Sequence, residues 1–417
     1  MKFLRATPVK VPMGRSWHQR GAMSGKTHPW GAPPWTVDFR PAPHTLPEQV
    51  DFAIVGGGFT GLSAAAWLRR LSPKKSVVVF ESSSLGQGAS GRTGGLALAE
   101  TAAGPLPGLS DVLAGYQEIL RKLRIDSSLE LPGVWELGRS NTANKLPICW
   151  SDSGDLKVVR TVPGGAVDPG KVVAGLGRAV ENAGAQIIEH AQVHAIEYSN
   201  PPRLQIRRKV RSHVQQTEIR ASQILLATNA FSLELAGLRG TAQAKLTLAL
   251  ATRPLTAGQL KAIGLSSRHP FYTIDLPYLW GRLLESNGIV FGAGLVPMPA
   301  SIDALFSKPS GPSAQQSAEP NLYRFDVRKG EAAESFCWLE SRVHKLHPAL
   351  RSARITHRWA GPILFTEGMR PIFRHHPRSE NVMVLAGYNG HGVALSVYLG
   401  QWAAEALLGK RPLPDWR

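Results

Sequence analysis

The sequence predicts an α/β fold, in which a Rossmann-like domain is interleaved with a second domain of the α+β class built on a mixed or antiparallel sheet. An apolar, β-like run at Phe52–Val55 is followed by a glycine turn, GGGFTG, at residues 56–61 and by a helix of small residues from Leu62 to Leu71. A second β-branched run, Val77–Phe80, ends at the acidic residue Glu81. This order and spacing are those of a βαβ unit that binds a dinucleotide.

Each residue type in the turn has a physical reason. Gly56 permits the sharp turn, Gly58 leaves out the Cβ that would block a pyrophosphate, and Gly61 lets the helix pack close to the strand. The N–H groups that open the helix, at Phe59 and Thr60, face the phosphate charge and add the attraction of the helix dipole. We therefore predict these five residues as cofactor contacts.

The turn alone does not separate NAD from FAD. Glu81 can accept hydrogen bonds from a ribose diol, and Ser82 follows it. The next loop, GQGASGRTGG at residues 86–95, is small, polar and rich in glycine, and it can lie along a bulky cofactor, whereas a simple nicotinamide fold would continue into another helix. The cofactor contacts predicted in this loop are Gly88, Ala89, Ser90, Gly91, Arg92, Gly94 and Gly95.

The chain resembles the D-amino-acid-oxidase-like superfamily of FAD-dependent oxidoreductases, and within it the γ-glutamylputrescine oxidase and glycine and sarcosine oxidase types. The resemblance begins with VGGGFTGLSAA at residues 55–65 and GASGRTGG at residues 88–95. It continues with PGGAVDPG at 163–170, ILLATNAFS at 224–232, RWAG at 358–361 and AGYNGHGVA at 386–394. The motifs stand in the family's order along most of the chain.

The resemblance implies FAD as the cofactor, bound by a glutathione-reductase-like domain. It also implies further contacts: Val193 beside the adenine, and, from the later motifs, Thr228, Asn229, Gly361, Gly387, Tyr388, Asn389, Gly390, Gly392 and Val393. Sarcosine oxidase attaches FAD through a cysteine, and the matching position here is Ile363, so FAD is expected to be held without a covalent bond. That enzyme activates oxygen with a lysine, whereas the matching strand here offers Val290.

The resemblance and the alternation of strands and helices together divide the chain. Residues 50–100, 165–235 and 356–417 are predicted to form the discontinuous FAD-binding domain, and residues 101–164 and 236–355 the substrate domain. Residues 1–49 are predicted to form an irregular arm over the body of the protein. The stretch KPSGPSAQQSA at residues 308–318 is typical of an exposed loop.

Composition excludes several classes of protein. The 48 Lys and Arg against 30 Asp and Glu give a net charge of +18, which would draw acidic substrates. The charges are scattered and no nucleic-acid or zinc motif is present, so we expect neither a specific nucleic-acid site nor a metal. No apolar stretch has the length of a transmembrane helix. The two cysteines, Cys149 and Cys337, form no disulfide framework, which favours the cytoplasm.

The substrate side is less marked in the sequence. The catalytic candidates are His391 at the opening of the last helix, Trp359 in RWAG, Tyr278 as a pocket wall together with Trp280, and Arg282, with Arg253 as the alternative, for pairing with a substrate carboxylate. The predicted activity is oxidation of the C–N bond of a small amine or amino acid. Hydride passes to flavin N5, the imine is hydrolysed, and O2 is reduced to H2O2.

Two alternatives stay open at this point. The first is a dehydrogenase that passes electrons to a quinone or to a protein carrier. The second is a non-catalytic flavoprotein or a basic nucleic-acid-binding protein. The sequence does not give the oligomeric state.

Overall fold

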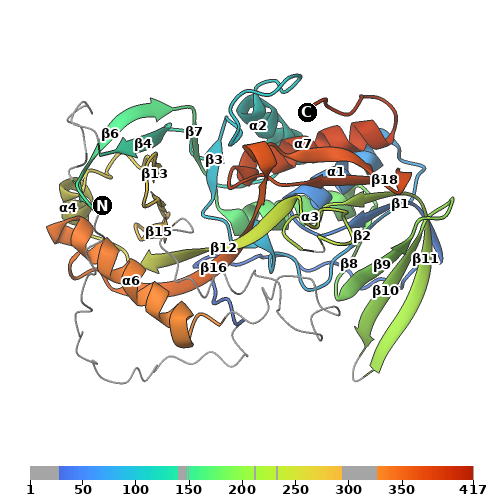
Figure 1. The fold of residues 1–417 in the computed structure, drawn as a ribbon, viewed down its shortest axis with the longest axis horizontal. Coiled ribbons are helices and arrows are strands. Elements are labelled where there is room, and N and C mark those ends of the chain that lie inside the picture. Colours follow the sequence, from blue (N-terminus) through green and yellow to red (C-terminus); the bar gives the residue numbers. More distant parts are fainter. Residues whose placement is uncertain are drawn as a thin grey trace, which may run out of the picture.

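The computed structural model describes residues 28–139, 148, 150–210, 213–231, 233–293 and 326–416. Cys149 and the loop predicted at residues 308–318 lie outside these ranges. The described chain forms two large sheets side by side, with helices gathered on the first (Figure 1). Among the described residues, no helix is long and apolar enough to cross a membrane.

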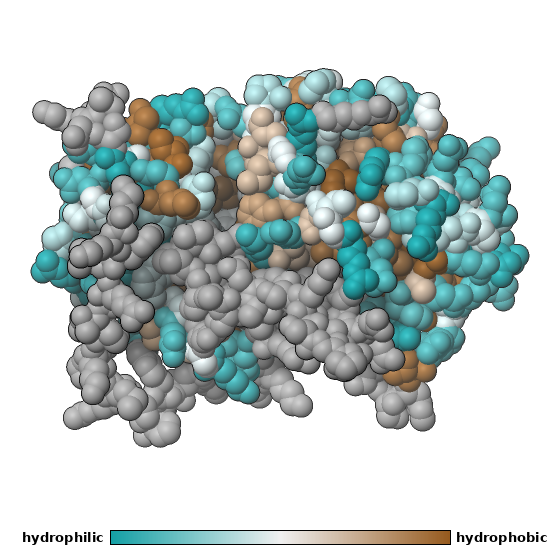
Figure 2. All heavy atoms as spheres, viewed as in Figure 1, coloured by the Kyte–Doolittle hydropathy of each residue, from teal (hydrophilic) through white to brown (hydrophobic). Residues whose placement is uncertain are grey.

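The first sheet carries the predicted dinucleotide unit. Its strand order is β17-β18-β11-β1-β2-β8, and β1, β2, β8, β11 and β18 run parallel. The strands are β1 (Gln49–Val55), β2 (Val77–Phe80), β8 (Gln186–Ile188), β11 (His213–Leu226), β17 (Ile372–His376) and β18 (Ser379–Ala386). The segments β9 (Ala191–Glu197) and β10 (Arg203–Val210) extend β11 as an antiparallel ribbon, whose exposed face is mostly hydrophilic (Figure 2).

Helices cover this sheet because their apolar faces match it. The helices are α1 (Phe59–Leu71), α2 (Val112–Leu123), α3 (Pro169–Asn182) and α7 (Gly392–Leu407), and α1 packs against both α3 and α7. The small residues of α1 allow this close approach, since Ala64, Ala65 and Ala66 are fully buried between its neighbours. Gly400 of α7 has the same role, because a Cβ there would lie 2.7 Å from Thr60 O.

The second sheet is mixed, as predicted. Its order is β16-β12-β15-β14-β13-β4-β6-β5, and among these described strands only the β13–β4 pair is parallel. The strands are β4 (Val134–Gly138), β5 (Trp150–Ser151), β6 (Asp155–Val162), β12 (Ala242–Thr252), β13 (Phe271–Thr273), β14 (Leu279–Leu283), β15 (Ile289–Ala293) and β16 (Ile355–Thr366). Beside it lie α4 (Ala257–Ala262), α6 (Gly330–Leu346) and the short helix η4 (Pro348–Leu350).

Short elements join the two sheets. The strands β3 (Leu96–Leu98) and β7 (Gly164–Ala166) pair with each other, and η1 (Ala89–Gly91) and η5 (Glu367–Met369) lie in connecting loops. Two segments pack with the sheet of the other domain than the one to which the predicted boundaries assign them. Strand β16 pairs with β12 of the second sheet along its length, and α2 packs on α7 of the first.

The described part of the N-terminal arm is irregular, but two of its side chains are buried in the core. Trp30 is 2% exposed and Trp35 8% exposed, so both indoles belong to the core. Trp30 O accepts a hydrogen bond from Ala360 N (2.9 Å), and Gly31 pairs with Trp359 as an isolated bridge. The arm therefore packs against the edge strand β16 of the second sheet.

Candidate functional site

A cavity of about 920 Å³ lies between the two sheets. Its walls come from the glycine turn after β1, the loop at residues 86–94, the inner faces of β12 and β16, and the start of α7. Most of the predicted site residues line it: Gly56, Gly58, Phe59, Thr60, Glu81, Ser82, Gly88, Ala89, Ser90, Arg92, Gly94, Val193, Thr228, Asn229, Tyr278, Trp359, Gly361, Tyr388, Asn389, Gly390, His391, Gly392 and Val393.

Four predicted contacts, all glycines, lie just behind the wall. They shape the loops instead of facing the cavity: Gly61, Gly91, Gly95 and Gly387. A Cβ at Gly61 would lie 2.0 Å from Gly56 O, so this glycine sets the close approach of α1 to β1. Gly387 has a φ of +78°, which favours glycine at this turn after β18.

The glycine turn leaves the amino end of α1 open to the cavity. The N-cap residue of this helix is Gly58, which has no side chain of its own to cap it. A Cβ at Gly58 would lie 2.9 Å from Ser90 Oγ, and the same oxygen accepts a hydrogen bond from Phe59 N (2.9 Å). Apart from this one bond from Ser90, the helix start is lined by bare backbone, and such a start is a binding site for an anionic group such as a phosphate.

Glu81 ends β2 at the edge of the same turn. Its Oε2 accepts from Gly57 N (2.8 Å) and its Oε1 from Ser83 N (2.9 Å). Removal of the carboxyl from water raises the pKa of Glu81, and the two backbone donors oppose this shift. Oε1 also accepts from Ser82 Oγ (3.3 Å), so the free acceptor position that a ribose hydroxyl could use is on Oε2.

The loop at residues 86–95 is held by its own arginine. The guanidinium of Arg92 donates from Nε to Gln87 O (3.0 Å) and from Nη1 to Gly31 O (2.9 Å), which joins the loop to the arm. Burial lowers the pKa of Arg92 to about 10, so the group stays charged at neutral pH. Trp359 Nε1 donates to Arg92 O (2.9 Å), and this bond fixes the indole against the loop.

The arm also contributes two residues to the cavity wall, His28 and Trp30, which the sequence did not predict. His28 Nδ1 accepts from Trp30 N (3.1 Å), which requires this nitrogen to be unprotonated. Burial, and then the charge of Arg92, lower the pKa of His28 from 6.5 to about 4. The imidazole of His28 is therefore neutral in the folded protein at pH 7.

Acid is expected to loosen this part of the arm. Because the pKa of His28 is lower in the fold than in the unfolded chain, its contribution to stability is present above pH 6.5 and is lost as the pH falls towards 4. The melting temperature of a His28→Asn variant should fall less over this range, since the amide oxygen accepts from Trp30 N at any pH. The exposed His375, changed to Asn, is the control. If the melting temperature of His28→Asn falls with pH as steeply as that of the wild type, His28 is not the source of the acid sensitivity.

The opening of α7 forms the opposite wall. Its N-cap, His391, makes no capping bond, and Nδ1 of His391 lies 3.3 Å from Asn389 O. Burial lowers the pKa of His391, which favours the neutral ring at pH 7. Asn389 bonds through Oδ1 to Thr366 N (2.8 Å) and through Nδ2 to Gly387 O (2.7 Å), which ties the turn to β16.

Tyr388 connects the two helix openings. Its hydroxyl lies 2.6 Å from Thr60 Oγ1, so the first turn of α1 and the turn before α7 are directly hydrogen bonded. Burial raises the pKa of Tyr388, which therefore stays protonated. The starts of α1 and α7, neither of which is capped by its own N-cap residue, thus face one cavity.

The half of the cavity under the second sheet is mainly aromatic and aliphatic. Trp280 lies against the loop, since a Cβ at Gly94 would be 2.2 Å from its ring. The remaining lining residues on this side are Leu96, Leu98, Lys245, Thr247, Ala249, Tyr272, Thr273, Ile274, Tyr278, Leu279, Pro362, Ile363, Leu364, Phe365 and Met369. Strand β12 alternates, with Lys245, Thr247 and Ala249 facing inwards.

Arg282 does not lie where a substrate carboxylate could reach it. It is 6% exposed and lies behind the loop, with Nε bonded to Gly94 O (2.6 Å) and the guanidinium 5.4 Å from the Trp35 ring. The prediction fails because β14 turns this side chain towards the arm. Arg253, its alternative, is exposed and does not line the cavity. Arg282 is therefore a support for the Gly94 carbonyl.

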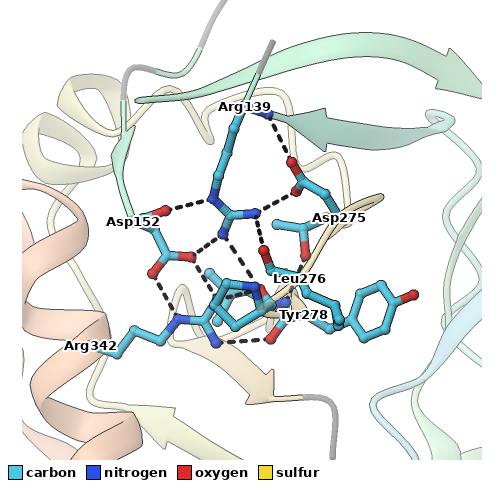
Figure 3. A network of polar contacts seen from close by, with 9 residues as sticks. Arg139, Asp152, Asp275, Leu276, Tyr278 and Arg342 are labelled. Carbon is cyan, nitrogen blue, oxygen red and sulfur yellow. Dashed lines mark hydrogen bonds and ion pairs between the residues drawn. The ribbon is translucent and has the colours of Figure 1, made fainter. Parts of the chain in front are cut away.

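A buried polar network fixes the rim near Tyr278 (Figure 3). Asp152 is 7% exposed and accepts from Arg139 Nη2 (2.8 Å) and from Arg342 Nε and Nη2 (2.8 and 2.6 Å). Arg342 also donates to Pro277 O (2.7 Å) and to Tyr278 O (2.8 Å). The backbone of this segment is thereby held, while the Tyr278 ring points away from the charges (Figure 3).

The comparison with known families decides the cofactor. A family model described as "DAO: FAD dependent oxidoreductase" matches residues 51–406. The chain belongs to this family of FAD-dependent oxidoreductases.

Individual relatives agree with this membership. The chain is 25% identical to a probable oxidoreductase, OrdL, of Haemophilus influenzae, over 89% of the chain and 86% of that protein. It is 24% identical to the gamma-glutamylputrescine oxidoreductase of Escherichia coli, over 88% of the chain and 85% of that protein.

Solved structures have the same fold. Glycine oxidase from Geobacillus kaustophilus superposes with a TM-score of 0.63 at 18% identity, over 88% of the chain and 97% of that structure. Iminodiacetate oxidase from Chelativorans sp. BNC1 superposes with a TM-score of 0.60 at 15% identity, over 88% and 97%. The predicted α/β FAD-binding fold is confirmed.

The residues of the cavity fit FAD. Bare backbone at Gly58 and the open start of α1 suit its pyrophosphate, and Oε2 of Glu81 keeps an acceptor position for the ribose. The described residues that line the cavity include no cysteine, and Ile363 is among them. The described wall of the cavity therefore offers no thiol for a covalent link to FAD.

Proposed function

We propose that this FAD-dependent oxidoreductase oxidises the C–N bond of a small amine or amino acid. The observation that carries the proposal is that one cavity joins the dinucleotide turn of the first sheet to an aromatic chamber on the second. A flavin ring bound between them would face a substrate on the chamber side. The names of gamma-glutamylputrescine oxidoreductase, glycine oxidase and iminodiacetate oxidase support the amine or amino-acid class.

The reaction balances with oxygen as the oxidant. The amine loses two electrons and two protons to become an imine, water converts the imine to a carbonyl compound and ammonia or an amine, and O2 takes up two electrons and two protons as H2O2. FAD supplies the acceptor for the hydride. The chain's own groups are left with binding, orientation and electrostatic stabilisation.

Three parts of the wall have roles in this scheme. The uncapped start of α7 points its N–H dipoles into the cavity and would stabilise negative charge there. The neutral His391 lies at the same opening and would act through its position and hydrogen bonding. Tyr278, Trp280 and Trp359 would shape the substrate chamber.

Anaerobic reduction tests the proposed function. Purified protein is expected to carry FAD, and its flavin absorbance should be bleached by at least one of glycine, sarcosine, proline or a polyamine conjugate. Each mole of substrate should then yield one mole of H2O2 in air. Protein that binds FAD but is bleached by no amine in a broad panel contradicts the proposal.

The electron acceptor is a separate question. A dehydrogenase remains the second candidate. Sarcosine oxidase activates oxygen with a lysine, and the matching strand position here is Val290. Stopped-flow mixing of the reduced protein with air separates the two, since slow reoxidation favours a quinone or protein acceptor. A cytoplasmic location stays a prediction from the cysteine count.

A further inference from the structure

Lys245 places an ammonium group in the half of the cavity under the second sheet. It lies on β12 beside Ile363 of β16, and its side chain lines the cavity. Nζ lies 5.8 Å from the centroid of the Phe365 ring, a cation–π contact that orients the group. Apart from this ring, the Lys245 side chain has no hydrogen bond or ion pair to any residue that the structure describes.

Other polar groups of this half are already engaged. Thr247 Oγ1 donates to Ala293 O, the Tyr272 hydroxyl donates to Glu136 Oε1 (2.6 Å), and Thr273 Oγ1 accepts from Leu279 N (2.8 Å). The ammonium of Lys245, by contrast, has three donors and no acceptor among them. Lys245 is therefore a half-buried cation whose N–H donors have no hydrogen-bond acceptor among the described residues.

The charges around the cavity favour an anion at this point. Among the described residues that line it, the sole acidic side chain is Glu81, which lies at the nucleotide end and accepts bonds from Gly57 N and Ser83 N. Arg92 is committed to carbonyl oxygens of the loop and the arm. A dicationic polyamine would meet Lys245 with no described carboxylate to offset the repulsion.

We propose that Lys245 binds a carboxylate of the substrate, so that the enzyme acts on amino acids or N-substituted amino acids in preference to amines without an acidic group. This inference rests on the proposed function, because it names the residue that binds the carboxylate end of the same amine substrate. Partial withdrawal of the ammonium from water beside Phe365 strengthens the pairing.

Ligand binding without turnover tests the proposal directly. In the FAD-bound protein, benzoate and its neutral analogue benzamide are titrated and followed by the shift in flavin absorbance. Lys245→Met should weaken benzoate at least about ten-fold while benzamide is unchanged, because a charge-assisted hydrogen bond is lost. Lys245→Arg should retain benzoate binding. The control is Lys261→Met, which removes an exposed lysine of α4.

Turnover then separates this proposal from the function on which it rests. Matched pairs, such as alanine with ethylamine and sarcosine with dimethylamine, should show a preference for the carboxylated partner that Lys245→Met removes. Oxidation of both partners with equal kcat/KM overturns the role of Lys245 and leaves the proposed function standing. No bleaching by any amine, with Lys245-dependent benzoate binding intact, overturns the function instead. A Lys245→Met variant that only slows reoxidation by O2 also overturns the carboxylate role.

Discussion

A Gly58→Val variant is expected to lose most of its affinity for FAD while keeping its fold. The new Cβ would lie 2.9 Å from Ser90 Oγ, which cannot simply withdraw because it accepts the Phe59 N–H. The branched side chain would also stand at the open start of α1, where we expect the pyrophosphate to bind. Overpacking of this kind costs about 1–3 kcal/mol, so the Kd for FAD should rise roughly ten- to hundred-fold.

The measurement is the Kd of apoprotein for FAD, by quenching of flavin fluorescence, together with circular dichroism to confirm folding. Gly258→Val is the matched control, because the nearest atom to a Cβ at Gly258 is Thr256 Oγ1 at 3.9 Å, in the first turn of α4. A folded Gly58→Val protein with the wild-type Kd would show that the phosphates do not rest at α1.

Asp152→Ala is expected to cause the largest loss of stability. The change removes the buried carboxylate between Arg139 and Arg342 and leaves two guanidinium groups facing each other, of which only Arg139 keeps a described carboxylate partner, Asp275. Breaking a buried ion pair by removing one partner costs about 3–5 kcal/mol, since the remaining charge is uncompensated. Because Arg342 also holds the carbonyls of Pro277 and Tyr278, we further expect KM to rise more than kcat falls.

Thermal unfolding followed by flavin fluorescence measures the first effect. Asp155→Ala, which removes an exposed carboxylate at the start of β6, should leave the melting temperature unchanged. The double variant Asp152→Ala with Arg342→Met should recover part of the loss, because it also removes one of the two opposed charges. Equal melting temperatures for the Asp152 and Asp155 variants would mean that the network carries no net stability.

Local patterns predicted the first sheet well. Val77–Phe80 is a strand with the predicted bounds, and its four residues are buried. The helix α1 begins earlier than Leu62, at Phe59, because the last residues of the glycine turn already form its first turn. Period and turn chemistry are short-range properties, so they can be read without the rest of the fold.

The missed features depend on contacts between distant segments. The sequence around Trp30 has no helical or strand-like apolar periodicity. Its backbone partner, Ala360, lies in the far C-terminal part of the chain. Arg282 resembles a substrate-binding arginine in sequence, but its partner is the carbonyl of Gly94. Lys245 carried one available signal, since small or polar residues at 245, 247 and 249 alternate with the buried Leu246, Leu248 and Leu250.

The strand order of the first sheet bears on when the protein can take up its flavin. The central strand β11 lies between β1, from the start of the domain, and β18, which comes far later in the chain. The helix α7 follows β18 and packs on α1. During translation, the glycine turn therefore leaves the ribosome long before its opposite wall exists, and stable loading of FAD has to await the emergence of the last strand and helix.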